Sequence, residues 1–199
     1  MKVYHMSQTL APQDPLLPDH EHLLAYSGPF IQALEHSKDC FFALLLQGKY
    51  LYNVFRRSGL TAEWVNYAKW ATEAIFEVVR RRSFSDCISR LQCSYFYTDL
   101  AEVQRLFVYD WGGDPEGAAQ VHVYEMELAD EAPACFDMAL YDLAYEAIEQ
   151  RQDVAAAMDA AHRYFAGQRA QQPVPELLSA QPARVTQDLS ALTADWLRT

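Results

Sequence analysis

The chain has 199 residues, about half of them apolar, and a formal net charge of -11 at neutral pH. Its length and apolar content predict a single globular domain over residues 1–199 rather than a disordered chain. The negative charge argues against general binding to nucleic acid, which requires a basic face that displaces counterions, and against attraction to a membrane.

The four cysteines, Cys40, Cys87, Cys93 and Cys135, form no CxxC pair, and no histidine lies at ligand spacing from two of them. We therefore expect no metal site and no disulfide framework. No signal peptide is recognisable, and the longest apolar run is too short to cross a bilayer. A cytoplasmic protein is expected, with delivery into another cell as an effector as the alternative.

The first predicted element is a short strand over Lys2–Met6, followed by a proline-rich loop. Ser27-Gly28-Pro29 predicts the end of any structure formed by residues 19–26, because proline lacks the amide hydrogen that a helix interior needs. From Phe30 to Phe55 apolar residues recur near the helical period, with a break around residues 38–39. Helices are therefore expected over about 28–82.

The clearest helix of this stretch has Thr61 as a candidate N-cap and ends in the basic run of residues 80–82, which suits the negative end of the helix dipole. Its apolar stripe consists of Trp64, Ala68, Ala71, Ile75 and Val78. Next comes a short aromatic strand, Cys93–Tyr97, which turns directly into a helix capped by Thr98 or Asp99. That helix buries Leu100, Val103, Leu106 and Phe107.

A turn at residues 111–115 precedes a predicted strand over Ala119–Leu128. Because strand side chains alternate, Glu125 and Glu127 share one face with Val121 and Val123. Two helices follow, over residues 136–150 and 153–168. Prolines make the tail irregular before a last short helix that contains Trp196. Few strands among long helices predict an α+β fold rather than a regular parallel sheet.

Several short motifs resemble, in their order and spacing, the bacterial DUF2441 family and, more widely, the ADP-ribosyltransferase-like superfamily. These motifs are Tyr4-His5, Glu77-Val78-Val79-Arg80, Ser89-Arg90-Leu91, the strand and helix of Ser94–Phe107, Tyr124–Glu127 and Asp137-Met138. The resemblance implies a split β-sheet core over about residues 1–145 with a helical insertion at about 28–82. Residues 146–199 would then be a helical C-terminal extension.

The same resemblance implies that NAD+ is the substrate and places its binding site. His5 would bind a ribose, and Tyr95 would stack on the nicotinamide, because Tyr95-Phe96 is similar to the Tyr-Phe segment of poly-ADP-ribose polymerases. A second stacking aromatic would be Phe107 or Tyr109, and Arg90 would hold a phosphate. Tyr4, Ser89 and Tyr97 complete the expected NAD-binding set. The chain lacks the arginine near the first strand that some of these families use.

The resemblance also implies a carboxylate that stabilises the positive charge built up on the ribose when the nicotinamide bond breaks. Three residues are candidates, in the order Asp137, Glu127 and Glu125. Asp137 is similar in position to the aspartate of rifampicin-modifying ADP-ribosyltransferases. Taken singly, each of these carboxylates is more typical of a helix cap or a solvated strand face.

The expected function is therefore a mono-ADP-ribosyltransferase, a pentosyl-transferring enzyme, acting as a toxin, effector or defence protein. Its acceptor, whether a protein, a nucleic acid or a small molecule, stays open. The alternative is a catalytically inactive interaction module on the same fold that binds a basic partner through the acidic surface. A third reading, an unrelated helical scaffold, requires His5, Tyr95 and Asp137 to lie far apart.

Overall fold

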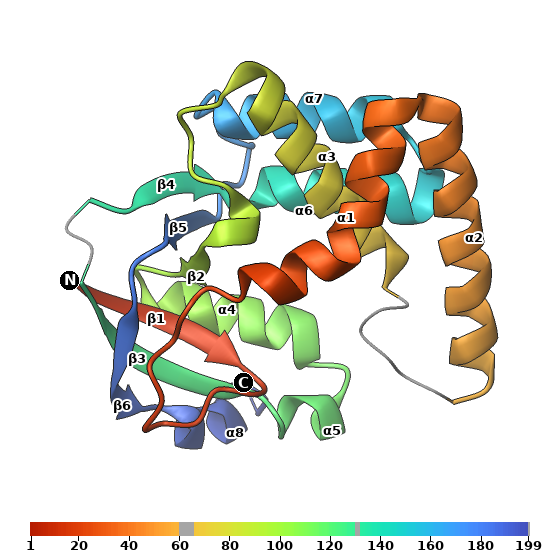
Figure 1. Ribbon diagram of the computed structural model, residues 1–199. Coiled ribbons are helices and arrows are strands. Elements are labelled where there is room, and N and C mark those ends of the chain that lie inside the picture. The colour runs from red at the N-terminus through yellow and green to blue at the C-terminus, as the bar shows by residue number, and fades with distance from the viewer. Residues whose placement is uncertain (60–65, 130–131, 199) are drawn as a thin grey trace. The chain divides into compact units, whose positions relative to one another are not determined.

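The structure is a computed structural model that describes residues 1–59, 66–129 and 132–198. It contains both helices and sheets, as an α+β fold requires (Figure 1). The chain divides into two compact units. The strand unit comprises residues 1–18, 93–136 and 174–199, and the helical unit comprises residues 19–92 and 137–173.

The strand unit contains two three-stranded sheets, in the orders β1-β3-β6 and β2-β5-β4. The strands are β1 (Lys2–Ser7), β2 (Ser94–Phe96), β3 (His122–Leu128), β4 (Ala134–Asp137), β5 (Pro175–Ser179) and β6 (Ala183–Asp188). The pairs β1–β3, β3–β6 and β2–β5 are antiparallel. A single bridge between Tyr4 and Tyr97 joins β1 to β2, so the strand order continues from one sheet into the other.

The β1-β3-β6 sheet has an apolar cluster on each face, and the alternation of β3 leaves Glu127 exposed. Val123 and Tyr4 pack on one face against Val103 and Phe107 of α4 (Leu100–Trp111) and against Trp196 of α8 (Thr193–Trp196). On the other face, a second cluster contains Val3, Phe96, Tyr124, Met126, Leu128, Leu177 and Ala183. The unit also contains α5 (Pro115–Ala118) and the short helix η4 (Ser190–Leu192).

The helical unit is built around α3 (Tyr67–Ser83), whose residues Ala68, Ala71, Ile75 and Val78 are buried as predicted. The other helices are α1 (His20–His36), α2 (Lys38–Arg57), η2 (Arg90–Gln92), α6 (Met138–Glu146), η3 (Ala147–Arg151) and α7 (Val154–Phe165). Asn66 caps α3 by accepting from the Lys69 amide, while the predicted cap Thr61 and Trp64 lie outside the described residues. Ser37 separates α1 from α2, which confirms the predicted break, and Gly59 adopts a left-handed φ of 67° beyond α2.

Two predictions about the elements were wrong. Pro29 lies inside α1 rather than ending it, because Ser27, Phe30, Ile31 and Leu34 are all buried and their packing outweighs one lost backbone hydrogen bond. Residues 175–188 form β5 and β6 rather than part of a helical extension. Pro175 is tolerated because it is the first residue of its strand.

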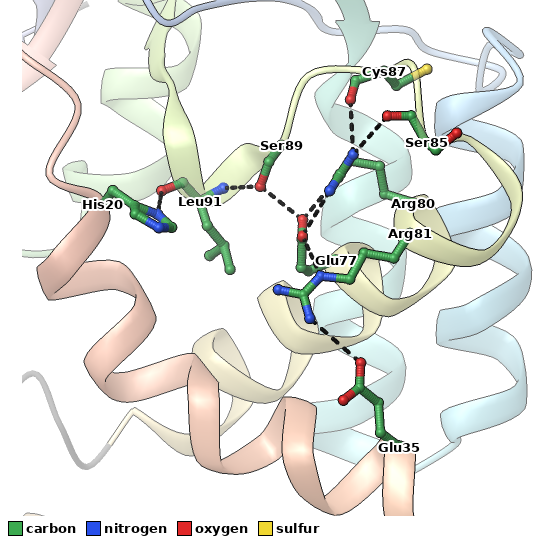
Figure 2. A network of polar contacts seen from close by, with 9 residues as sticks. All are labelled: His20, Glu35, Glu77, Arg80, Arg81, Ser85, Cys87, Ser89 and Leu91. Atoms are coloured by element: carbon green, nitrogen blue, oxygen red, sulfur yellow. Dashed lines mark hydrogen bonds and ion pairs between the residues drawn. The ribbon is translucent and has the colours of Figure 1, made fainter.

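A buried carboxylate ties the segment after α3 back onto that helix (Figure 2). Glu77 accepts hydrogen bonds from Arg80, Arg81 and Ser89, at 2.7 to 3.0 Å. Arg80 also donates to the backbone carbonyls of Ser85 and Cys87. Burial alone would raise the pKa of Glu77, but these hydrogen bonds outweigh it and hold the pKa below its usual value.

Glu77→Gln removes the negative charge that these donors share and leaves Arg80 with an imperfect partner. We expect the free energy of unfolding to fall by about 3 kcal/mol, because breaking a buried ion pair leaves a charge uncompensated. Urea denaturation followed by circular dichroism measures this. Glu35→Gln is the matched control, since Glu35 contacts the same Arg81 from an exposed position, and its effect should stay below about 1 kcal/mol. Equal losses in both variants would contradict the prediction.

Candidate functional site

The candidate site lies in the strand unit where the ladder between β1 and β2 stops. Tyr4 and Tyr97 exchange both backbone hydrogen bonds, at 2.8 and 2.9 Å. In a continuing antiparallel ladder, the next bond to the Tyr95 carbonyl would come from the amide of Met6. The His5 side chain is bonded there instead, with its Nδ1 atom 2.8 Å from the Tyr95 carbonyl oxygen. The histidine therefore lies where the two sheets separate.

This hydrogen bond determines the tautomer of the neutral His5 ring. A carbonyl oxygen can only accept, so Nδ1 carries the hydrogen, and Nε2 of the neutral ring is then an acceptor. Burial lowers the pKa of His5 below its usual value, and the bond to Tyr95 opposes this only in part. The ring also lies 5.9 Å from that of Phe96. At neutral pH the site therefore presents an imidazole with one acceptor nitrogen, which suits a sugar hydroxyl.

Sequence reasoning missed a buried carboxylate on the neighbouring strand. Glu176 belongs to β5, which pairs with β2 through Phe96 and Leu177, and its side chain is only 1% exposed. One further step in this antiparallel register brings Glu176 opposite Tyr97, the residue that bridges to Tyr4. Tyr97 directly follows the last residue of β2, and Tyr4 directly precedes His5 on β1.

A signal for Glu176 was present in the sequence, but the prolines obscured it. Pro175-Glu176-Leu177-Leu178-Ser179 is a short apolar run with one charge inside it. A carboxylate within a buried strand is uncommon, because burying a charge is costly, and such residues are enriched at functional sites. Prolines at 173, 175 and 182 instead predict an irregular tail, so the local sequence does not indicate a strand here.

Two of the predicted carboxylates, Glu125 and Glu127, lie on β3 in the strand unit. Glu125 forms an ion pair of 2.6 Å with Lys2 and accepts from the Thr186 hydroxyl. The hydrogen bond from Lys2 lowers the pKa of Glu125. Glu127 is exposed. Both carboxylates lie on β3, which pairs with β1, and Glu125 stands opposite Tyr4 in that register.

The first-ranked carboxylate, Asp137, is fully buried and acts as a helix cap. Its Oδ1 accepts from the Ala139 amide at the start of α6, and its Oδ2 accepts from the Ala170 amide at 2.7 Å. All three residues belong to the helical unit. Both oxygens thus accept from backbone donors, which is the geometry of a helix cap.

Ser89 and Arg90 also belong to the helical unit, where side chains of that unit engage both of them. Ser89 donates to Glu77 at 2.7 Å (Figure 2). Arg90 is 5% exposed, forms an ion pair of 3.2 Å with Glu73 and donates to the Tyr164 hydroxyl. Its guanidinium lies 4.1 Å from the centre of the Tyr141 ring. The expectation that Arg90 holds a phosphate therefore gains no support from its surroundings.

The aromatic candidates divide into strand and helix residues. Tyr95 lies in β2, Tyr97 directly follows that strand, and both are half-buried. Phe107 is fully buried against Trp111 and Trp196, which is the position of a core residue, whereas Tyr109 on the same helix is 84% exposed. Asp99 caps α4 by accepting from the Ala101 amide, as the sequence predicted. Tyr95 and Tyr97 are therefore better exposed than Phe107 for stacking on a ligand.

Residues 1–59, 66–129 and 132–198 contain no group of His, Cys, Asp and Glu side chains arranged to hold a metal ion. Over the same residues, no helix combines the length and the apolar character needed to cross a membrane.

Comparison with models of known protein families matches residues 29–191 to the family described as a protein of unknown function, DUF2441. Comparison with curated proteins finds no match. The matched range includes Tyr95 and Glu176 and begins after His5. It also extends beyond residue 145, where the sequence resemblance was expected to end.

A pH titration tests the assignment of His5 as a neutral imidazole. In the unfolded chain His5 takes up a proton near pH 6.5, whereas the folded chain resists it until lower pH. The contribution of His5 to stability should therefore be complete above about pH 6.5 and decline below it. We expect the stability difference between the wild type and His5→Gln to shrink between pH 7.5 and 5.5, measured by urea denaturation. A difference independent of pH would contradict the assignment.

Proposed function

The chain belongs to the DUF2441 family, and we propose that it is an NAD+-dependent mono-ADP-ribosyltransferase whose site lies in the strand unit. The observation that carries the proposal is the hydrogen bond between His5 and the Tyr95 carbonyl. Two motifs that lie 90 residues apart in the sequence, and that were expected to bind one nicotinamide riboside, are in contact. The split between β1 and β2 also fits the split core expected from the superfamily.

In this proposal His5 and Tyr95 bind and orient NAD+. The Nε2 atom of His5 accepts a hydrogen bond from a ribose hydroxyl, while Nδ1 remains bonded to the Tyr95 carbonyl. The Tyr95 ring packs against the nicotinamide and holds the leaving group in line. Because Nδ1 is fixed by the backbone of β2, the histidine pays little orientational entropy when the sugar binds.

We assign the catalytic carboxylate to Glu176 in place of Asp137, Glu127 or Glu125. The bond between the nicotinamide nitrogen and C1′ of the ribose breaks, its electron pair leaves with nicotinamide, and positive charge builds on the ribose. A carboxylate held beside that ribose stabilises the charge more in the transition state than in the ground state. The acceptor then forms a bond to C1′ and loses a proton. Glu176 lies on the strand next to Tyr95 and is shielded from water.

The charge of the strand unit favours a cationic or neutral acceptor over a nucleic acid. This unit contains only four basic residues in the sequence: Lys2, Arg105, Arg184 and Arg198. Lys2, Arg105 and Arg198 each form an ion pair with a nearby carboxylate. A surface of this kind repels a polyphosphate backbone.

Binding of NAD+ is the first test, since it requires no knowledge of the acceptor. At a concentration about a hundred times the dissociation constant, NAD+ should stabilise the wild type by about 2.7 kcal/mol, seen as a rise in melting temperature. ADP-ribose and ATP serve as controls. His5→Gln keeps a donor for the Tyr95 carbonyl and removes the ring acceptor, so it should lose most of the shift. No shift in the folded wild type would favour the inactive interaction module instead.

Glu176→Gln separates binding from catalysis. We expect it to keep the thermal shift with NAD+ and to lower the rate of nicotinamide release by at least about a hundred-fold, because a neutral amide cannot stabilise the cationic ribose. Release is followed by chromatography. Glu127→Gln is the control, as it changes the same side chain at an exposed site on β3 and should keep nearly full activity. Full activity in Glu176→Gln would overturn the assignment.

A further inference from the structure

Helix α2 carries a row of exposed apolar side chains along its whole length. Phe42, Leu46, Tyr50 and Val54 follow one another at intervals of four residues and are 43%, 45%, 69% and 41% exposed. Residues four apart lie on neighbouring turns of a helix, so these side chains form one continuous ridge, called here the α2 ridge. Single exposed apolar residues are ordinary, whereas a contiguous ridge of four indicates a contact surface.

The opposite side of α2 is also apolar, and it packs within the helical unit. Phe41 and Leu45 are fully buried, and Gly48 lies so close to Tyr67 of α3 that an added Cβ would come within 2.5 Å of the Tyr67 Cβ. A cavity of about 260 Å³ remains between α1, α2 and Tyr67. A helix that is apolar on both sides is usually covered on both sides. The structure covers the inner side of α2, and the α2 ridge is the uncovered one.

The charges of α2 indicate what kind of partner covers the ridge. The helix contains Lys38, Lys49, Arg56 and Arg57 against a single acidic residue, Asp39. Its net charge is thus +3, while that of the whole chain is -11. Pairing of α2 with the same helix of a second copy would bring two positive surfaces together. An anionic membrane would attract α2 but repel the acidic remainder of the chain.

We propose that the α2 ridge is a docking site for an acidic amphipathic helix of another protein. The apolar face of that helix covers Phe42, Leu46, Tyr50 and Val54, and its carboxylates meet Arg56 and Arg57 at the end of α2. A ridge of residues four apart packs into the matching groove of a second helix, with the two axes crossing at about −50°. This surface belongs to the helical unit and is independent of the proposed transferase activity.

The test uses a fluorescein-labelled synthetic peptide of about 20 residues, with leucines at every third or fourth position and glutamates between them. Fluorescence anisotropy measures its binding to the wild type. Leu46→Glu should weaken binding by at least about ten-fold, since it places a charge in the centre of the apolar contact. Leu143→Glu on α6 is the matched control, because Leu143 is 44% exposed and Leu46 is 45% exposed. It should leave the affinity nearly unchanged.

Two further measurements examine the role of charge in peptide binding and the folding of the variants. A peptide with lysines in place of the glutamates should bind more weakly than the acidic one, and added salt should weaken the acidic peptide's binding. Circular dichroism and a thermal melt should show that Leu46→Glu and Leu143→Glu are both folded. If folding of Leu46→Glu fails, Tyr50→Glu takes its place, since Tyr50 is the most exposed residue of the ridge.

Several results would overturn the proposal. One is an acidic peptide that does not bind the wild type at about 100 μM, or that binds wild type and Leu46→Glu equally. Another is a scrambled peptide of the same composition that binds as well as the amphipathic one. Sedimentation equilibrium that shows a dimer lost in Leu46→Glu would assign the ridge to a second copy. Flotation with anionic vesicles that depends on Leu46 would assign it to a membrane.

Discussion

The candidate site depends on one hydrogen bond, from the imidazole of His5 to the Tyr95 carbonyl. It stands where a backbone amide would otherwise continue the ladder between β1 and β2, so the two strands stay joined at Tyr4 and Tyr97 while their sheets separate. The same bond fixes the tautomer of the ring and leaves Nε2 as an acceptor. Through β2, it also connects β1 to β5, the strand that carries the buried Glu176.

Buried charges have different roles in the two units. In the helical unit Glu77, Arg90 and Asp137 are engaged by donors or acceptors of the same unit, and these contacts connect segments that lie apart in the sequence. In the strand unit Glu176 is equally buried and lies on β5, the strand that pairs with β2. Residue type alone therefore does not separate a structural carboxylate from a candidate catalytic one. The strand or helix that carries the residue makes the difference.

The helical unit carries a second candidate surface, the α2 ridge. Its helix α2 is apolar on the side that packs against α1 and α3 and apolar again along the α2 ridge. The positive charge of this helix contrasts with the acidic chain around it. A transferase site in one unit and a docking ridge in the other would allow partner choice and chemistry to be altered by separate substitutions, because their residues do not overlap.

The sequence by itself determined the features that depend on near neighbours. The Asp99 cap, the alternation of β3, the break between α1 and α2, and the apolar stripe of α3 all follow from residues a few positions apart. The sequence also identified His5 and Tyr95 as candidate site residues. Only the tertiary structure decided that Pro29 lies inside a helix and that Pro175 begins a strand. It likewise showed that Asp137 caps α6 while Glu176 lies one strand away from Tyr95. These outcomes depend on packing and pairing with residues far away in the chain, and local patterns carry no information about such partners.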